Sequence, residues 1–344
     1  MRLRGIRRRR LRGEGPVVLL YHRVDRPSTD PQLLCVTPEH FAEHLELIAE
    51  GYEPLPLRDL VASLREGELP PRAVTITFDD GYADNLVAAK PLLERHRVPA
   101  TVFVASGWIG ADRPFWWDDL EFLLVRAGRL PPVLALEIGG ERLQWELGDD
   151  ASYTPEAAAA RSGWTVLDRH DPGPRQRIYR ELTTRFRALD TCARERVLEY
   201  LRTIVEQSDA ADGELPRPLT LGELRRLGDG HLVDIGAHTV THPTLSRLEP
   251  AEQREEIWGC KCQLEGALGR RLASFAYPYG GAKDFDSTSA RIVRDAGFDH
   301  ACANVSSRLG RGADVFRLPR VLVRDCGGAE LARTLAHLDP PCFR

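Results

Sequence analysis

Two short clusters combine carboxylates and imidazoles in a way that suits a metal site. The first is Asp79-Asp80, which follows the apolar run 73–78 and precedes Gly81. Two adjacent carboxylates repel each other, and a cation that neutralises one of them removes that repulsion. Side chains alternate along a strand, so one carboxylate can face a metal and the other a substrate. The same letters are common in turns and helix caps, so this cluster alone leaves both interpretations open.

The second cluster is the histidine pair His238 and His242, which follows the strand-like segment Leu-Val-Asp-Ile-Gly at 232–236. If this stretch coils into a helical turn, the two imidazoles lie on one face, a common way to bind zinc. The intervening residues lack the glutamate of the metalloprotease pattern, so that class is not supported. Two unrelated surface histidines are the alternative. The aspartate pair at the end of another expected strand favours a metal site with open positions for water and substrate.

A third cluster, Phe-Ala-Tyr-Pro-Tyr-Gly-Gly at 275–281, places aromatic rings beside exposed backbone. An ordinary turn is one interpretation. The functional interpretation is a wall on which a sugar stacks, formed by Tyr277, Pro278 and Gly280, with a backbone N–H that stabilises an oxyanion. Trp117, in the aromatic and acidic run 115–119, is a second candidate for this wall, and core packing is its alternative.

Strands that alternate with helices must position these clusters. Apolar or β-branched runs predict strands at 17–21, 73–78, 100–104, 232–236, 272–276 and 300–303. Helices are predicted between them, for example after Thr37, an N-cap residue followed by Pro38 and ended by Gly51. Six or seven such units predict an α/β barrel of parallel strands, whose reacting groups lie where the strands end.

The alternation breaks at about 108–218. A strictly alternating pattern over 133–147, around two glycines, predicts a hairpin, and polar helices are expected over 174–189 and 193–205. Thr220 and Glu223 have the spacing of a capping box, which restarts the α/β pattern. We therefore predict one barrel domain over 16–344 with a large α+β insertion that does not fold separately.

Composition excludes several functions. The chain has 47 basic and 51 acidic residues and a formal charge of −4, so no overall field attracts it to nucleic acid. Residues 1–15 are arginine-rich and predict a disordered tail, with peripheral contact to an anionic membrane surface as the alternative. No apolar segment of signal-peptide length follows them, so the sequence predicts a cytoplasmic location. If the tail does contact a membrane, we expect it to contact the inner face.

The clusters, in this order, resemble the polysaccharide deacetylases of the NodB-homology type, carbohydrate esterase family 4, over about 16–338. The resemblance rests on two sequence motifs, Thr-Phe-Asp-Asp-Gly at 77–81 and His-Thr-x-x-His at 238–242. The resemblance implies a distorted (β/α)7 barrel that removes N-acetyl groups from amino sugars. It implies that Asp79 is the general base and that the Tyr279 N–H stabilises the oxyanion. It also implies a divalent metal, usually Zn²⁺ with Co²⁺, Ni²⁺ or Mn²⁺ as alternatives, on Asp80, His238 and His242.

Two positions depart from the family pattern. The family often has an arginine where Tyr277 stands, and the nearby Arg320 is our candidate for that positive charge and for substrate binding. The family's late Leu-x-His, which carries the general acid, is matched only in a helical stretch that ends at His337. The start Tyr21-His22 is instead similar to the biofilm poly-N-acetylglucosamine deacetylases, in which the acid histidine lies on the N-terminal strand. His22 is therefore our candidate acid, and a structural histidine is the alternative.

The expected partner is an N-acetylated amino sugar: a polysaccharide, a lipid-linked or nucleotide-linked glycan precursor, or a small glycoside. The sequence determines neither which of these it is nor the metal or the oligomeric state. Two other functions stay open. One is the same metal chemistry on a non-sugar C–N bond, and the other is a catalytically inactive carbohydrate-binding protein.

Overall fold

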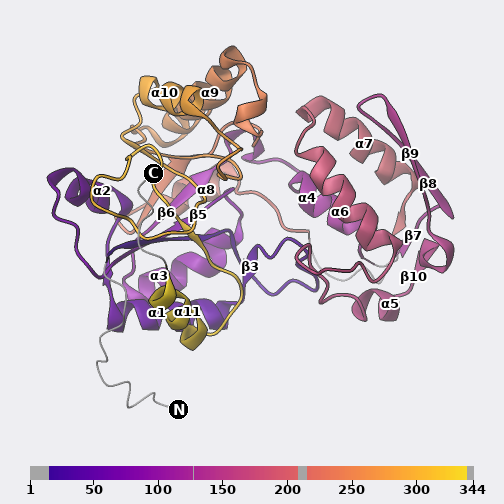
Figure 1. Ribbon diagram of the computed structural model, residues 1–344, viewed down its shortest axis with the longest axis horizontal. Coiled ribbons are helices and arrows are strands. Elements are labelled where there is room, and N and C mark those ends of the chain that lie inside the picture. Colours follow the sequence, from indigo (N-terminus) through magenta and orange to yellow (C-terminus); the bar gives the residue numbers. More distant parts are fainter. Residues whose placement is uncertain (1–14, 127, 208–214, 339–344) are drawn as a thin grey trace.

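A curled parallel sheet forms the core of the left-hand body in Figure 1, a computed structural model that describes residues 15–126, 128–207 and 215–338. Seven strands follow one another in the order β14-β13-β12-β6-β5-β1-β15, and β4 pairs with β5. The strands are β1 (Val17–Tyr21), β4 (Glu53–Pro54), β5 (Ala73–Phe78), β6 (Ala100–Val104), β12 (Val233–Ala237), β13 (Ser274–Ala276), β14 (His300–Cys302) and β15 (Val321–Leu322). Every residue of β1, β5 and β6 is buried, which explains their continuous apolar runs.

The two ends of this sheet approach each other through the segment before β15. The Leu318 N–H donates to the Ala301 carbonyl (2.9 Å), and the Ala303 N–H donates to the Leu318 carbonyl (2.8 Å). The chain then enters β15, which pairs with β1. The sheet is therefore a curled half-barrel of seven strands, and the predicted distorted (β/α)7 fold class is confirmed.

Helices cover the outer face of the sheet (Figure 1). They are α1 (Pro38–Gly51), α2 (Leu57–Glu66), α3 (Lys90–His96), α8 (Leu221–Leu227), α9 (Pro250–Leu268), α10 (Ser287–Asp295) and α11 (Gly328–His337). The Thr37 hydroxyl caps α1 by accepting the His40 N–H, as its sequence predicts. The helix predicted between β5 and β6 starts irregularly, because residues Asn85–Ala89 form a π-helical turn (η1) before α3. Pro91 has no N–H for the regular α-helical ladder, which accounts for the wider turn.

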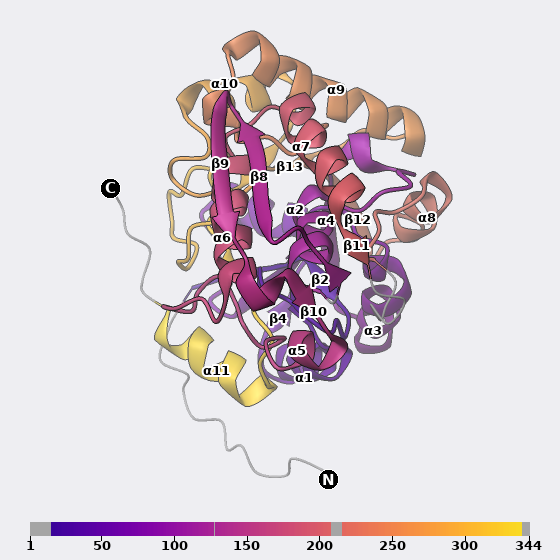
Figure 2. The same cartoon turned by 90° about the vertical axis from the view of Figure 1, so that its right-hand side faces the viewer.

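The segment between β6 and β12 builds a lobe beside the barrel, at the right of Figure 1 and facing the viewer in Figure 2. Its elements are α4 (Trp116–Leu124), β7 (Gly128–Arg129), β8 (Val133–Ile138), β9 (Glu141–Glu146), β10 (Ser152–Tyr153), α5 (Pro155–Ala159), α6 (Pro174–Phe186), α7 (Thr191–Ile204) and β11 (Glu206–Gln207). The predicted hairpin is β8–β9, which turns at Gly139 and Gly140 with φ of 60° and 82°. The lobe has its own hydrophobic cluster, to which Tyr82 and Ala105 of the barrel contribute.

A buried arginine fixes the first turn of α6 in this lobe. The Arg175 guanidinium donates hydrogen bonds to the carbonyls of Asp150, Gly128 and Ala151 at 2.6–3.0 Å. These bonds tie the start of α6 to backbone carbonyls of β7 and of the turn before β10. The first turn of α6 is therefore anchored to the rest of the lobe.

No helix in the described ranges is long and apolar enough to cross a membrane. Apart from Gly15, the arginine-rich tail predicted over 1–15 lies outside the residues that the structure describes. The cytoplasmic location and the membrane contact of that tail therefore stay predictions.

Candidate active site

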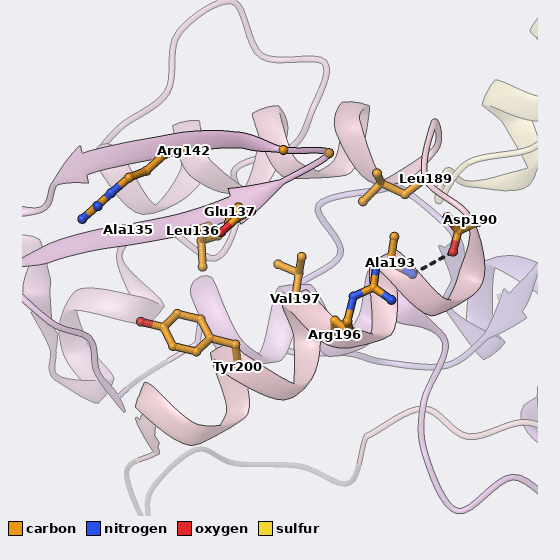
Figure 3. Close-up of a pocket in the computed structure, with 12 residues that line it drawn as sticks. Ala135, Leu136, Glu137, Arg142, Leu189, Asp190, Ala193, Arg196, Val197 and Tyr200 are labelled. Carbon is orange, nitrogen blue, oxygen red and sulfur yellow. Dashed lines mark hydrogen bonds between the residues drawn. The ribbon is translucent and has the colours of Figure 1, made fainter.

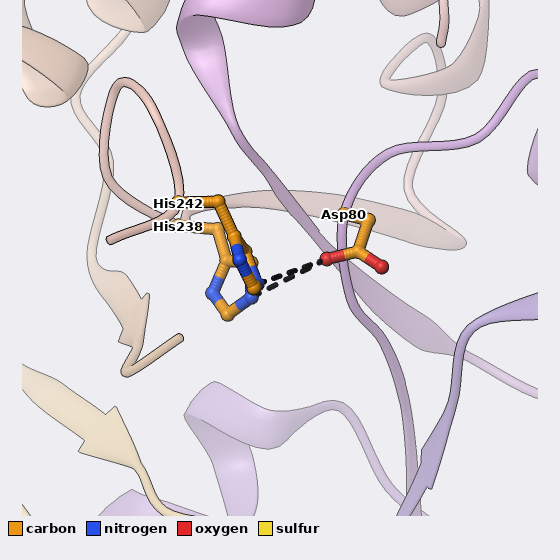
Figure 4. Close-up of side chains that lie close together, drawn as sticks. All are labelled: Asp80, His238 and His242. Atoms are coloured by element: carbon orange, nitrogen blue, oxygen red, sulfur yellow. Dashed lines mark ion pairs between the residues drawn. The ribbon is translucent and has the colours of Figure 1, made fainter. Parts of the chain in front are cut away.

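Asp80, His238 and His242 meet where β5 and β12 end, and both imidazoles point toward the aspartate (Figure 4). Asp80 Oδ1 lies 3.6 Å from His238 Nε2 and 3.4 Å from His242 Nε2. All three side chains are buried, and Asp80 Oδ1 has no hydrogen-bond donor among the described residues. Burial and then the neighbouring Asp79 raise the pKa of Asp80 well above its usual value. A divalent cation at this point would relieve that unfavourable burial, so these residues fit a metal.

The backbone around these residues adopts left-handed conformations. Asp80, Thr239 and His242 have φ of 73°, 67° and 60°, values that are uncommon for residues with a side chain and that concentrate at functional sites. Residues 238–242 therefore form no helical turn, because a right-handed helix cannot continue through Thr239, and the loop itself brings the two imidazoles together. The carboxylate of Glu256 instead accepts the N–H groups that follow Thr239 in this loop.

A backbone contact fixes the orientation of His238. Its Nδ1 lies 2.8 Å from the Ala276 carbonyl, which assigns the proton to Nδ1 and leaves the Nε2 lone pair facing Asp80. Burial lowers the pKa of both His238 and His242 below the usual histidine value. Both imidazoles are therefore neutral at pH 7, which is the form that binds a metal.

Asp79 points to the same space and pairs with Arg320. Two guanidinium nitrogens of Arg320 lie 2.6 and 2.7 Å from the two carboxylate oxygens. Burial by itself raises the pKa of Asp79, but Arg320 and the nearby His238 outweigh it and hold the pKa below its usual value. Asp79 is therefore a carboxylate at neutral pH. Arg320 is 0% exposed, so the prediction that it contacts the substrate is wrong. Its positive charge acts on Asp79 instead.

A cavity of about 340 Å³ opens over these groups. It is lined by His22, Gln32, Leu34, Asp79, Asp80, Trp116, Trp117, Thr183, Arg187, His238, His242, Tyr279, Gly281, Asp284, Asn304 and Leu322. His22 follows β1, and its Nδ1 has no hydrogen-bond partner among the described residues. Burial lowers the pKa of His22 to about 4, although Asp79 opposes this shift, so the free imidazole is neutral at pH 7. His337 lies exposed on α11 and does not line this cavity.

The loop after β13 brings only part of its predicted wall to the cavity. Tyr279 has a φ of 59°, its ring lies 4.7 Å from that of His242, and its N–H has no acceptor among the described residues. Pro278 and Gly280 shape the loop without lining the cavity. The prediction that Tyr277 forms part of the wall is wrong, because its ring is 0% exposed and stacks on Phe285 in the core. Its hydroxyl donates a hydrogen bond to the buried Phe316 carbonyl.

Trp117 lies both in the wall of the cavity and in the core of the inserted lobe. Its indole stacks on Phe115, and its ring centroid lies 5.0 Å from that of His242. Its Nε1 donates to the Tyr82 hydroxyl (2.7 Å), which in turn donates to Asp118 (2.8 Å). The side chain is 6% exposed, so the indole presents only a small part of its surface to the cavity.

Sequence reasoning missed Arg187 and Asp284, which both line the cavity. Arg187 directly follows α6, and its guanidinium lies 4.0 Å from the centre of the Tyr279 ring. Its Nη2 forms an ion pair with Asp284 at 3.0 Å. Nothing in the local sequence distinguishes Arg187 from the many other arginines. It reaches the cavity only because α6 packs beside the barrel.

Comparison with known proteins agrees with this geometry. The family model described as "Polysaccharide deacetylase" matches residues 66–128 and 209–301, which leaves most of the inserted lobe unmatched. YxkH of Bacillus subtilis, whose name assigns it to the same family, is 32% identical over 95 residues, 27% of this chain and 33% of its own length. A poly-beta-1,6-N-acetyl-D-glucosamine N-deacetylase of Escherichia coli K12 is 29% identical over 109 residues, 30% of this chain and 16% of its own length.

Two solved structures share the fold over almost the whole chain. The deacetylase PplD of Streptococcus pyogenes has a TM-score of 0.56 at 17% identity and covers 93% of this chain and 98% of its own. IcaB of Ammonifex degensii has a TM-score of 0.56 at 18% identity, and the match covers 94% of this chain and 98% of IcaB. Fold and site thus define an α/β barrel with a candidate metal centre where its strands end. The polysaccharide deacetylase family model matches a little under half of this chain, and the chain spans a third or less of the curated relatives' length.

Proposed function

We propose that this protein is a metal-dependent hydrolase that removes an N-acetyl group from an amino sugar. One observation carries the proposal. Asp79, kept ionised by Arg320, lies beside the Asp80–His238–His242 cluster, with its Oδ2 3.8 Å from His238 Nε2. A base and a metal-binding set in one cavity suit hydrolysis of an amide. The family and the name of the Escherichia coli relative support an N-acetylated glycan as the substrate.

Asp80, His238 and His242 would hold the metal. Two imidazole nitrogens and one carboxylate oxygen suit Zn²⁺, and Co²⁺, Ni²⁺ and Mn²⁺ accept the same donors. When bound, such a cation polarises the amide carbonyl and lowers the pKa of a water to about 7. The neutral imidazoles need no deprotonation to bind it.

Asp79 and Tyr279 carry the next steps of the proposal. The Asp79 carboxylate takes a proton from the attacking water, and Arg320 keeps it oriented and ionised for this task. The carbonyl oxygen gains negative charge as the water adds. The Tyr279 N–H, which has no acceptor among the described residues, donates a hydrogen bond to that oxygen.

His22 is our proposed proton donor to the departing sugar nitrogen. Because its pKa is about 4 in the free protein, the imidazole does not store a proton at neutral pH. The proton must therefore arrive during the reaction, and the one that Asp79 takes from water is available. The two residues line the same cavity and influence each other's pKa, so a transfer between them across the substrate is consistent with their placement.

Acetate release from N-acetylated glycans tests this function. Asp79→Asn should lower kcat by about 10²–10⁴-fold, the range typical of a general base, while the metal content stays at the wild-type level. Asp234→Asn is the matched control, because Asp234 lies near the start of β12 and pairs with exposed arginines. Normal turnover by the Asp79→Asn protein would overturn the assignment.

The same assay separates the alternative functions. Polysaccharides, lipid-linked and nucleotide-linked precursors and small glycosides are compared as substrates, with formate and ammonia measured beside acetate. Release of formate or ammonia from non-sugar amides would indicate the same chemistry on another C–N bond. Glycan binding by the metal-loaded protein without any product would indicate a carbohydrate-binding protein.

A further inference from the structure

A second cavity, of about 600 Å³, adjoins the reaction cavity. The two share Gln32, Thr183, Arg187 and Asp284, so they lie directly beside each other. The shared residues come from the inserted lobe, from the loop after β13 and from the segment between β2 (Arg23–Val24) and β3 (Cys35–Val36). A substrate whose N-acetyl group lies beside Asp79 can therefore extend another of its groups into this second space.

The lining of the second cavity is strongly cationic. It includes the four basic side chains Arg180, Arg187, Arg247 and Lys283, and Asp284 is the one acidic residue among those that line it. The carboxylate of Asp284 is already engaged, because Oδ1 pairs with Arg187 and Oδ2 accepts the Gly281 N–H at 3.0 Å. The space therefore favours a negatively charged group.

Two of these cations are not neutralised within the protein. Arg180 donates to Asp171 and to nearby carbonyls, so its charge is compensated. By contrast, the Arg247 guanidinium and the Lys283 ammonium have no hydrogen-bond or ion-pair partner in the described part of the chain, and both residues are exposed. They can approach a ligand without first breaking an interaction.

Arg187 is held in place at the junction of the two cavities. Its carbonyl accepts the Thr244 hydroxyl (3.2 Å), its guanidinium lies over the Tyr279 ring, and its Nη2 pairs with Asp284. Its Nε and Nη1 have no acceptor among the described residues. A planar guanidinium with free donors and a fixed position is well suited to bind a phosphate or carboxylate through two hydrogen bonds.

A further cavity offers a contrast. It has a volume of about 840 Å³ and lies between the β8–β9 hairpin and α7 (Figure 3). Its charges are mixed, with Glu137 and Asp190 beside Arg142 and Arg196, and it shares no residue with the reaction cavity. The cationic cavity, by contrast, shares four residues with the reaction cavity, so it can act on the choice of substrate.

We propose that the second cavity binds an anionic group, a phosphate or a carboxylate, that is covalently attached to the amino sugar. Arg187, Arg247 and Lys283 would then determine specificity for acidic substrates. This inference rests on the proposed N-deacetylase function, because it places the acetamido group of the same molecule beside Asp79. An acidic substituent on the same or the adjacent sugar would be the feature that the enzyme recognises.

Binding to the metal-loaded Asp79→Asn protein tests the proposal without turnover. Calorimetry compares the binding of N-acetylglucosamine 1-phosphate with that of neutral N-acetylglucosamine. N-acetylmuramic acid is measured as well, as the sugar that carries a carboxylate. The sugar phosphate or the sugar carboxylate should bind at least tenfold more tightly than the neutral sugar, and added salt should reduce this preference. Whichever acidic sugar binds more tightly identifies the anion.

Charge-reversal variants locate the effect. The double substitution Arg247→Glu and Lys283→Glu should reduce the preference for the acidic sugar to twofold or less. The matched control is Arg254→Glu with Arg291→Glu, which changes the net charge equally on exposed residues that do not line the second cavity. Equal loss of preference in both proteins would overturn the proposal, since it would then reflect overall charge.

Two further outcomes separate this inference from the proposed function. Equal affinity for acidic and neutral sugars, or inorganic phosphate binding as tightly as the sugar phosphate, overturns the inference and leaves the deacetylase proposal intact. Failure of the wild-type protein to release acetate from acidic and neutral sugars alike counts against the deacetylase function itself, whatever the binding preference.

Discussion

Arg320 donates two hydrogen bonds to Asp79, at 2.6 and 2.7 Å, across a separation of 241 residues in the chain. Asp79 is 4% exposed and Arg320 is 0% exposed, so this ion pair is shielded from solvent. Arg320 is itself fixed by a bond from its Nε to the Ala303 carbonyl (3.0 Å). The guanidinium therefore sets both the direction in which Asp79 faces and its protonation state.

Removing this guanidinium should shift the pH dependence of the reaction. Arg320 holds the pKa of Asp79 below its usual value, so Arg320→Met should raise that pKa and move the acidic limb of the kcat/KM profile to higher pH. Arg320→Lys keeps the charge but loses the paired hydrogen bonds, so its profile should lie between those of wild type and Arg320→Met.

The same substitution should also lower stability. Breaking a buried ion pair costs about 3–5 kcal/mol, because it leaves a charge without a partner, so thermal unfolding is measured beside the kinetics. The pH profile is taken only at temperatures where each variant is folded. An Arg320→Met enzyme with an unshifted acidic limb would show that Asp79 does not act as the base.

Metal removal should abolish activity reversibly. Chelation of the ion from the Asp80–His238–His242 cluster should reduce acetate release to background, and added Zn²⁺ or another divalent ion should restore it. His242→Ala should lower the bound metal as measured by elemental analysis. His337→Ala is the control, because this histidine lies exposed on α11. Full activity in the chelated protein would contradict the metal site.

His22→Gln should lower kcat and leave metal content unchanged, because His22 lines the cavity but is not a member of the metal-binding cluster. A loss of about 10²-fold or more is expected if it delivers the proton to the leaving nitrogen. A substrate with a more acidic leaving group, such as an acetylated aromatic amine, should be less sensitive to this substitution. If the His22→Gln protein has the same kcat as the wild type, His22 is not the proton donor and Asp79 alone returns the proton to the leaving nitrogen.

Trp117 should be tested by substitutions that separate its ring from its N–H. Trp117→Phe keeps an aromatic surface but removes the hydrogen bond to Tyr82, whereas Trp117→Ala also opens a cavity against Phe115 and His242. A sugar-stacking role predicts that KM rises several-fold in Trp117→Ala and changes little in Trp117→Phe. An unchanged KM in a folded Trp117→Ala protein would assign the indole to packing alone.

Asp118 should make stability depend on pH. Burial raises the pKa of Asp118 to about 8, with Arg23 opposing the shift, whereas the unfolded residue has a pKa near 4. The folded protein therefore binds more protons between about pH 4 and pH 8, and its free energy of unfolding should decrease as pH rises through this window. Asp118→Asn should flatten that dependence, as measured by denaturant unfolding at several pH values. A slope equal to that of wild type would contradict the raised pKa.

Local patterns were sufficient to predict the strands, most helices and the two chemical clusters of the barrel. The buried strands are continuous apolar runs, and the caps of α1 and α8 are formed by the residues that their sequence indicates. The acidic pair after β5 and the histidine pair after β12 meet because the ends of parallel strands lie at one edge of a sheet. These features can be predicted because they depend on neighbouring residues, or on the parallel-sheet topology that alternating strands and helices imply.

The partners of these residues depended on packing between distant segments. Arg320 reaches Asp79 because β15 pairs with β1, which lies beside β5. Tyr277 turns into the core, and Arg187 reaches the cavity from a lobe whose position relative to the barrel no local pattern encodes. The sequence alone therefore determined which residues end the strands. Only the tertiary structure decided which charges face them, because that choice depends on contacts between segments far apart in the chain.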